Sequence, residues 1–135
     1  MNKAFMSVLL LVFIATSVWA APIGLKSAKI EPEQAKVRQT VTVTVEFTGN
    51  ADDIQMVELI VRENPYDAPE MYLQPKKDSD ANIWVLSAPV PEDAPYGDYH
   101  LEVKALTKDG KDVVTKEYKD QEWGKAGLIL FKVIK

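Results

Sequence analysis

The feature that most constrains the fold is a regular alternation of apolar and polar residues between positions 37 and 47. The apolar positions of this segment are Val37, Val41, Val43, Val45 and Phe47. Alternation with a period of two, rich in β-branched side chains, is typical of a strand with one buried face. A helix would scatter the same residues around its circumference. The segment therefore predicts a β-strand that lies against a core.

Six further segments have strand composition and are separated by turn residues: 54–62, 71–73 (a short edge strand), 83–87, 99–106, 113–118 and 128–134. Asp109-Gly110 predicts a tight hairpin turn of a primed type, because both residues tolerate positive φ angles. Pro89, Pro91 and Pro95 fall within seven residues, and prolines cannot donate to a ladder, so this segment is expected to cross between sheets. About seven strands and no helical segment predict an all-β antiparallel sandwich.

The first twenty residues have the order of a signal peptide. Lys3 supplies a positive start, residues 4–18 form an apolar run, and Val18 and Ala20 stand at the −3 and −1 positions of a cleavage site. An uncleaved membrane anchor is the alternative, but the run is shorter than the ~20 apolar residues that a spanning helix needs. We expect residues 1–20 to be a signal peptide and residues 21–135 to be one domain. The expected location is periplasmic or secreted, with no membrane insertion after processing.

Composition excludes several classes of function. The chain has no cysteine, which rules out disulfides, thiolate catalysis and a lipoprotein anchor. Its 16 basic and 20 acidic residues give a formal net charge of −4, with no basic stripe to neutralise phosphates. Nucleic acid is therefore not an expected partner. Export without disulfides is common among bacterial chains, which favours a bacterial source.

Several short motifs resemble those of the immunoglobulin-like (fibronectin III-like) domains of bacterial secreted and periplasmic proteins. They are Lys29-Ile30-Glu31-Pro32, residues 39–45, Trp84, Tyr96-Gly97-Asp98-Tyr99 and Asp109-Gly110. The resemblance implies an immunoglobulin-like β-sandwich that serves as a binding or spacer module. It also implies that Tyr99 is a tyrosine corner, with its hydroxyl bonded to upstream backbone, and that strands 54–62 and 128–134 flank the strand of Tyr99. The chain departs from antibody domains because it lacks both cysteines.

No catalytic or cofactor site is expected. His100 is the only histidine, and by the parity of its strand it faces outward with Asp98 and Glu102. An acid–base or metal role needs partners, and no nucleophile elbow accompanies this histidine. We therefore expect a noncatalytic protein without a metal or cofactor.

The predicted function is protein contact, with a partner of the cell envelope or with a second copy of the chain. The predicted strands 54–62 and 128–134 carry apolar residues on both faces, whereas a face exposed to solvent should be polar. The outward residues are expected to form one contact patch, with Trp123 at its rim. Its members are Ile54, Met56, Ile60, Leu106, Trp123, Leu128 and Leu130. The alternative is that residues 119–127 fold back and cover this patch.

The competing function is a ligand-binding module for carbohydrate or calcium. Trp123 lies in a polar segment, and together with Tyr66, Tyr72 or Tyr118 it suggests a stacking platform for a sugar. Asp78, Asp80 and Asn82 alternate in a turn as calcium-binding oxygens do, although the EF-hand pattern is excluded by Ile83 at its glycine position.

The predicted core lies between the two sheets. Its expected members are Val41, Val43, Val45, Leu59, Trp84, Leu86, Tyr99, Leu101 and Val103, and Val57 and Val61 share the inward face of their strand with Leu59.

Overall fold

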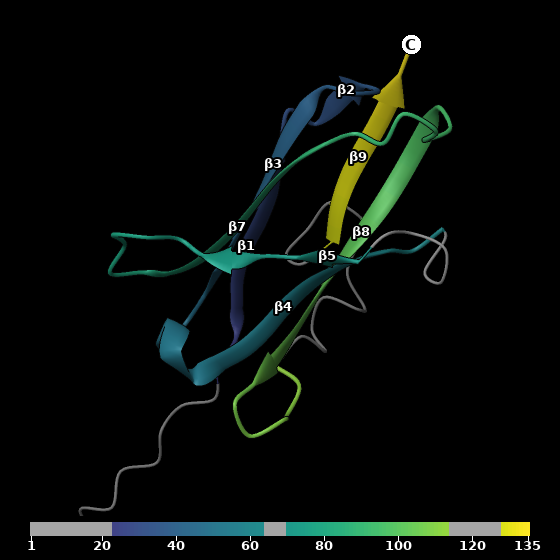
Figure 1. The fold of residues 1–135 in the computed structure, drawn as a ribbon. Helices are drawn as coiled ribbons and strands as arrows, with labels where there is room; N and C mark the ends of the chain where they lie inside the picture. The colour runs from purple at the N-terminus through teal and green to yellow at the C-terminus, as the bar shows by residue number, and fades with distance from the viewer. Residues whose placement is uncertain (1–22, 64–69, 114–127) are drawn as a thin grey trace, which may run out of the picture.

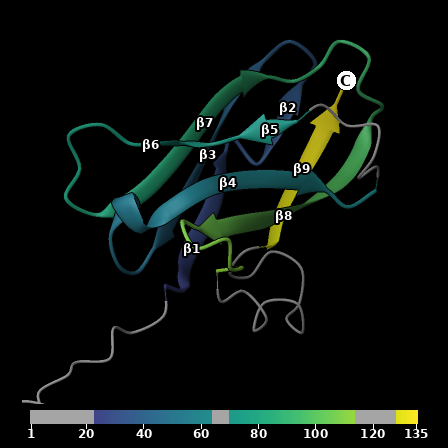
Figure 2. The same ribbon diagram turned by 60° about the horizontal axis from the view of Figure 1, so that its bottom comes forward.

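The computed structural model describes residues 23–63, 70–113 and 128–135, which form two sheets packed face to face (Figures 1 and 2). One sheet contains, in spatial order, β1 (Leu25–Glu31), β3 (Thr40–Phe47), β7 (Asn82–Pro89) and β6 (Gln74–Pro75). The other contains β2 (Gln34–Lys36), β9 (Leu128–Ile134), β8 (Gly97–Thr107), β4 (Ile54–Val61) and β5 (Met71–Tyr72). A short 3₁₀ turn, η1 (Ala51–Asp53), precedes β4. The predicted all-β sandwich is confirmed.

The strand order matches that of immunoglobulin-like sandwiches. The sheet β1-β3-β7-β6 corresponds to their ABED sheet, and β9-β8-β4 corresponds to their GFC strands. The central strand β8 pairs antiparallel with β4 on one side and with β9 on the other, as the resemblance implies. One pairing departs from the expected antiparallel arrangement, because β2 runs parallel to β9.

The tyrosine corner is present. The Tyr99 hydroxyl donates a hydrogen bond of 2.6 Å to the carbonyl oxygen of Pro95, four residues upstream. This bond ties the start of β8 to the crossover, residues 90–96, which carries the chain from β7 in one sheet to β8 in the other. The crossover lies at the end of the sandwich where the chain terminates (Figure 1).

The core fills the space between the sheets. Six of the nine predicted core residues are buried: Val43, Val45, Leu59, Trp84, Leu101 and Val103. The other three, Val41, Leu86 and Tyr99, are half-buried although they pack against this cluster. Val61 is also half-buried, whereas Val57 on the same strand is 1% exposed. These inward-facing but incompletely buried side chains have a common cause, given below.

Three described strands were not predicted. The edge strand β1 has a register shift between Leu25 and Ser27, which breaks its alternation, and β2 and β6 have only three and two residues.

The turn after β8 differs from the predicted primed type. Gly110 has a φ of 78°, and its N–H bonds to the Thr107 carbonyl, but the chain's positive-φ non-glycine positions do not include Asp109. This combination is typical of a type I turn followed by a glycine bulge. Of the predicted strand 113–118, residues 114–118 lie outside the described ranges.

Candidate functional site

The predicted contact patch is only partly reproduced. Met56, Ile60 and Leu106 are half-buried, and Leu130 is 43% exposed. All four belong to the outer face of the five-stranded sheet, by the parity of their strands. Trp123 lies outside the described residues, and so does the side chain of Leu128.

Ile54 is the exception, because it is 4% exposed and belongs to the core. The prediction that it faces outward is wrong. Ile54 pairs with Thr107 of β8, and Met56 pairs with Leu106. The two residues of β4 are two positions apart, whereas their partners on β8 are adjacent, so β4 contains one extra residue at this point. Such a bulge reverses the parity of the residues before it. Ile54 therefore joins Val57 and Leu59 on the inner face.

Charged residues separate the apolar side chains that remain on this outer face. Met56 pairs with Leu106, but the next outward pair along β4 and β8 is Glu58 with Lys104. Ile60 then lies opposite Glu102, and Leu130 on β9 lies opposite His100. The described part of this face is therefore mixed in character rather than one apolar patch.

An apolar cavity lies inside the sandwich. Between the two sheets, at the crossover end, is a cavity of about 290 Å³. We call it the inter-sheet cavity. The four-stranded sheet contributes Ile30, Val41, Val43, Leu86 and Ala88, and the other sheet contributes Leu59, Val61, Met71, Tyr99 and Leu101. Val41, Val61, Leu86 and Tyr99 all line it, which explains why these inward-facing residues are not fully buried.

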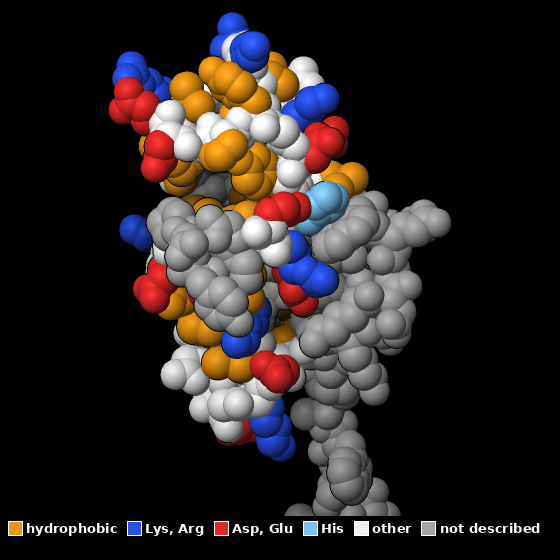
Figure 3. Space-filling model, turned by 90° about the vertical axis from the view of Figure 1, so that its right-hand side faces the viewer, with side chains coloured by type: hydrophobic (Ala, Val, Ile, Leu, Met, Phe, Trp, Pro, Cys, Tyr) orange, Lys and Arg blue, Asp and Glu red, His pale blue; other side chains and the backbone are white. Residues whose placement is uncertain are grey.

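The cavity opens at one edge of the sandwich. Strand β6 pairs only with Trp84 and Val85 of β7. From Leu86 to Pro89 the described partner of β7 is β3 alone, so no strand of the described residues covers the edge beside the cavity there. Figure 3, which faces the side of the crossover, shows a hollow bordered by hydrophobic side chains.

The crossover forms the rim of the cavity. Pro91, Asp93, Ala94 and Pro95 line it from this segment, and Asp93 is exposed. The crossover was predictable from its prolines, whereas the cavity was not predicted. The available signal was the combination of prolines, which cannot extend either sheet, with small side chains at Ala88 and Ala94, which leave space unfilled.

The walls that the two sheets contribute contain one polar side chain, Tyr99, and Asp93 adds a second at the rim. The Tyr99 hydroxyl is bonded to Pro95, and the ring forms part of the wall. Burial raises the pKa of Tyr99, and the negative charge of Glu63 raises it further. The hydroxyl therefore stays neutral at pH 7 and keeps its bond to the crossover.

Glu63 anchors the end of β4 to β8. It accepts hydrogen bonds of 3.0 and 3.1 Å from the backbone N–H of His100, and it also contacts the Nδ1 atom of the His100 ring. Partial burial raises the pKa of Glu63, but the hydrogen bonds from His100 outweigh this effect, so the pKa of this carboxyl lies below its usual value. His100 thus has a structural partner, Glu63, that its position in the sequence did not indicate.

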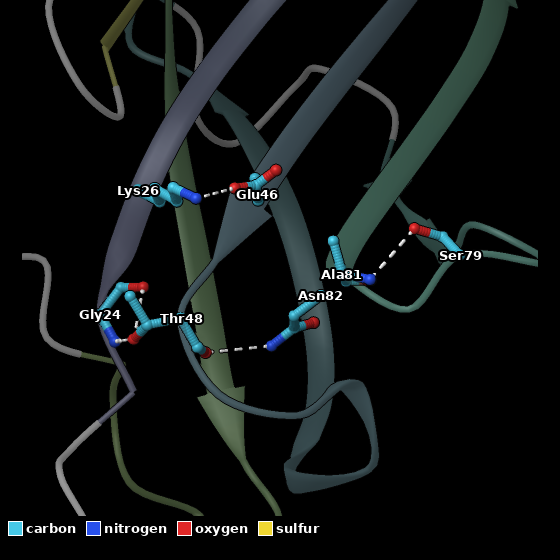
Figure 4. Close-up of polar contacts among 7 residues, drawn as sticks. All are labelled: Gly24, Lys26, Glu46, Thr48, Ser79, Ala81 and Asn82. Carbon is cyan, nitrogen blue, oxygen red and sulfur yellow. Dashed lines mark hydrogen bonds and ion pairs between the residues drawn. The ribbon is translucent and has the colours of Figure 1, made fainter.

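Of the three side chains proposed as calcium ligands, Asn82 is buried in the core and is hydrogen-bonded there. Asn82 is 3% exposed, and its side-chain oxygen accepts a hydrogen bond of 2.8 Å from the indole Nε1 of Trp84. Its amide nitrogen donates to the backbone oxygen of Thr48 at 3.2 Å (Figure 4). Asn82 therefore serves Trp84 and the β3–η1 connection rather than the turn. Within the described ranges, no three acidic or histidine side chains cluster as metal ligands do.

The proposed carbohydrate platform is not described, because Trp123, Tyr66 and Tyr118 lie outside the described ranges. Tyr72 is the described member of that group, and its side chain is 40% exposed on β5. The carbohydrate alternative stays a prediction. No helix within the described ranges has the length and apolar character needed to cross a membrane.

Comparisons with known proteins find similarity in backbone only. No family model and no curated protein sequence matches the chain. The crystal structure of a Niemann-Pick type C2 protein from Japanese carpenter ant superposes with a TM-score of 0.48 at 10% identity, covering 86% of this chain and 96% of that one. A GspB Siglec domain superposes with a TM-score of 0.46 at 15% identity, covering 81% of this chain and 58% of that one. At such scores and identities, neither likeness bears on the ligand of this chain.

Proposed function

We propose that this protein is a noncatalytic binding module that holds a small apolar molecule between its two sheets. The observation that carries the proposal is the inter-sheet cavity of about 290 Å³, with aliphatic walls and an open edge. Ligand sites in proteins are mostly apolar, largely pre-formed clefts of about 300–1,000 Å³. The cavity volume lies just below that range, so the ligand, or the part of it that enters the cavity, is expected to be small.

The apolar lining of the cavity also supports a ligand. Apolar surface removed from water contributes about 25 cal/mol per Å², so a hydrocarbon that covers these walls is stabilised by the contact. A spacer module has no use for such a site, whereas a binding module does.

A cavity-filling variant tests the proposal. Ala88 lines the cavity and is half-buried, so Ala88→Phe places a ring in the hollow. With the purified protein, 1-decanol is expected to raise the melting temperature through preferential binding to the folded state. The variant is expected to melt at or above the wild-type temperature without decanol and to gain nothing from it.

Ala81→Phe is the matched control, since Ala81 is exposed in the turn before β7 and does not line the cavity. It should respond to decanol as the wild type does. If wild type and Ala88→Phe respond equally, or if neither binds decanol in a calorimetric titration, the proposal is wrong.

The proposed site of action is the periplasm or the extracellular medium. What supports it is the order of Lys3, the apolar run 4–18 and the cleavage pattern ending at Ala20. The absence of cysteine is compatible with either compartment.

Protein contact through the outer face of the five-stranded sheet is the second candidate function. The observation in its favour is Leu130, which is 43% exposed on a strand whose inward neighbours Ile129 and Phe131 are buried. The partner would be a protein of the cell envelope or a second copy of the chain. The two candidates use opposite faces of this sheet and do not exclude each other.

A further inference from the structure

The chemistry of the inter-sheet cavity also constrains its ligand, and this inference rests on the function proposed above. The walls from both sheets are hydrocarbon, and the Tyr99 hydroxyl is already bonded to Pro95. A polar group placed deep in the cavity would lose its hydrogen bonds to water without finding a partner. The part of the ligand that enters must therefore be hydrocarbon.

The volume sets the length of that hydrocarbon. An apolar cavity of about 150 Å³ in another protein holds one benzene ring, which has six carbons. A cavity of about 290 Å³ is nearly twice that size. By this proportion it holds about a dozen carbons. The open edge beside Leu86 to Pro89 allows the remainder of the molecule to stay in solvent.

The rim carries negative charge. Asp93 lines the cavity and is exposed, and it pairs with no cation among the described residues. Arg38, which is hydrogen-bonded through its backbone to Val90, directs its guanidinium to Glu92. An anionic head group held directly beside Asp93 would be repelled by it, because the ion pairs of the described residues do not include Asp93.

We propose that the cavity binds a single alkyl chain of about twelve carbons whose head group, held beside Asp93, is cationic or uncharged but not anionic. Hydrophobic burial of the chain supplies most of the affinity, and the rim selects the head. Because the rim is exposed, its contribution is that of a surface charge pair and weakens as salt screens it.

The test compares three probes with the same tail, below their micelle-forming concentrations: dodecyltrimethylammonium, dodecyl maltoside and dodecanoate. Calorimetric titration is expected to give the weakest binding for dodecanoate. Asp93→Asn should reduce the preference for the cation over dodecanoate by about two- to fivefold, the scale of an exposed charge pair. Asp109→Asn makes the same change of charge in the turn beyond the other end of β8 and should leave the preference unchanged.

Tail length gives a second readout. Within the cavity each added methylene should strengthen binding by about fourfold, and the gain should cease near twelve carbons. Dodecanoate binding as tightly as the cation, or a preference that Asp93→Asn leaves intact, overturns this inference while decanol binding still supports the proposed function. If none of the three probes nor decanol binds, the proposed function itself fails.

Discussion

The Tyr99 hydroxyl donates a 2.6 Å hydrogen bond to the Pro95 carbonyl. This bond joins the first residues of strand β8 to the crossover that borders the inter-sheet cavity. Both residues line the cavity, so this bond fixes one wall of the site relative to its rim. Tyr99→Phe keeps the ring and removes the bond. We expect a loss of about 1 kcal/mol in the free energy of unfolding, measured with urea.

Tyr96→Phe is the control for this variant. Tyr96 is 58% exposed and does not line the cavity. Its loss of stability should be within measurement error, and an equal loss in both variants would show that the tyrosine corner contributes nothing specific.

Trp84 and Asn82 form a second coupled pair, inside the core. Trp84→Ala should cost on the order of 3–5 kcal/mol, because the side chain is 5% exposed and its removal leaves a large void. A loss below about 1 kcal/mol would contradict the core assignment. Asn82→Ala should cost about 1–3 kcal/mol, since it leaves the indole N–H buried without a partner.

A double-mutant cycle isolates this hydrogen bond. Trp84→Phe removes the donor and retains an aromatic ring. When combined with Asn82→Ala, it should cost less than the sum of the two single changes. Additive losses would mean that the bond is not made in solution.

Glu63 makes stability depend on pH in the acid range. The pKa of this carboxyl in the folded protein lies below its ordinary value, so folding favours the ionised form. The stabilisation is present above the unfolded pKa and is lost as the pH falls through the lower folded value. Glu63→Gln should therefore flatten the fall in melting temperature below about pH 4.5. Glu33→Gln, at an exposed position of the β1–β2 connection, should keep the wild-type slope.

The outer face of the five-stranded sheet is tested by changing Met56 and Ile60 together to Ser. Both are half-buried on that face and neither lines the cavity. If the face is a contact site, self-association or partner binding falls in analytical ultracentrifugation while the melting temperature is unchanged. If the melting temperature falls instead, other parts of the chain cover the face, and the contact function is abandoned.

Processing of the leader is tested by mass spectrometry of protein recovered from the periplasm or the medium. The expected mature chain begins Ala21-Pro22-Ile23, after cleavage at Ala20. A mature product that retains Met1 would refute the signal peptide.

Alternation along single strands was sufficient to predict the sandwich and much of its core. Val43 and Val45 are buried as their parity requires, and β9 spans the predicted residues 128–134. The bulge between Ile54 and Met56 was not predictable, because a bulge is a property of two strands and appears only in their register. Parity also indicates which way a side chain points but not how far apart the sheets lie. The half-burial of Val41, Val61, Leu86 and Tyr99, and with it the inter-sheet cavity, could not be derived from one strand at a time.

Leu101 stands two residues after the tyrosine corner, at the position where antibody domains carry the second cysteine of their inter-sheet disulfide. Here it is a 6% exposed leucine packed in the core, and the chain contains no cysteine. No disulfide joins the two sheets, so they are held together by packing, hydrogen bonds and the chain connections between them. The fold is therefore expected to be equally stable in a reducing or an oxidising compartment, and a reductant such as dithiothreitol should leave its unfolding midpoint unchanged.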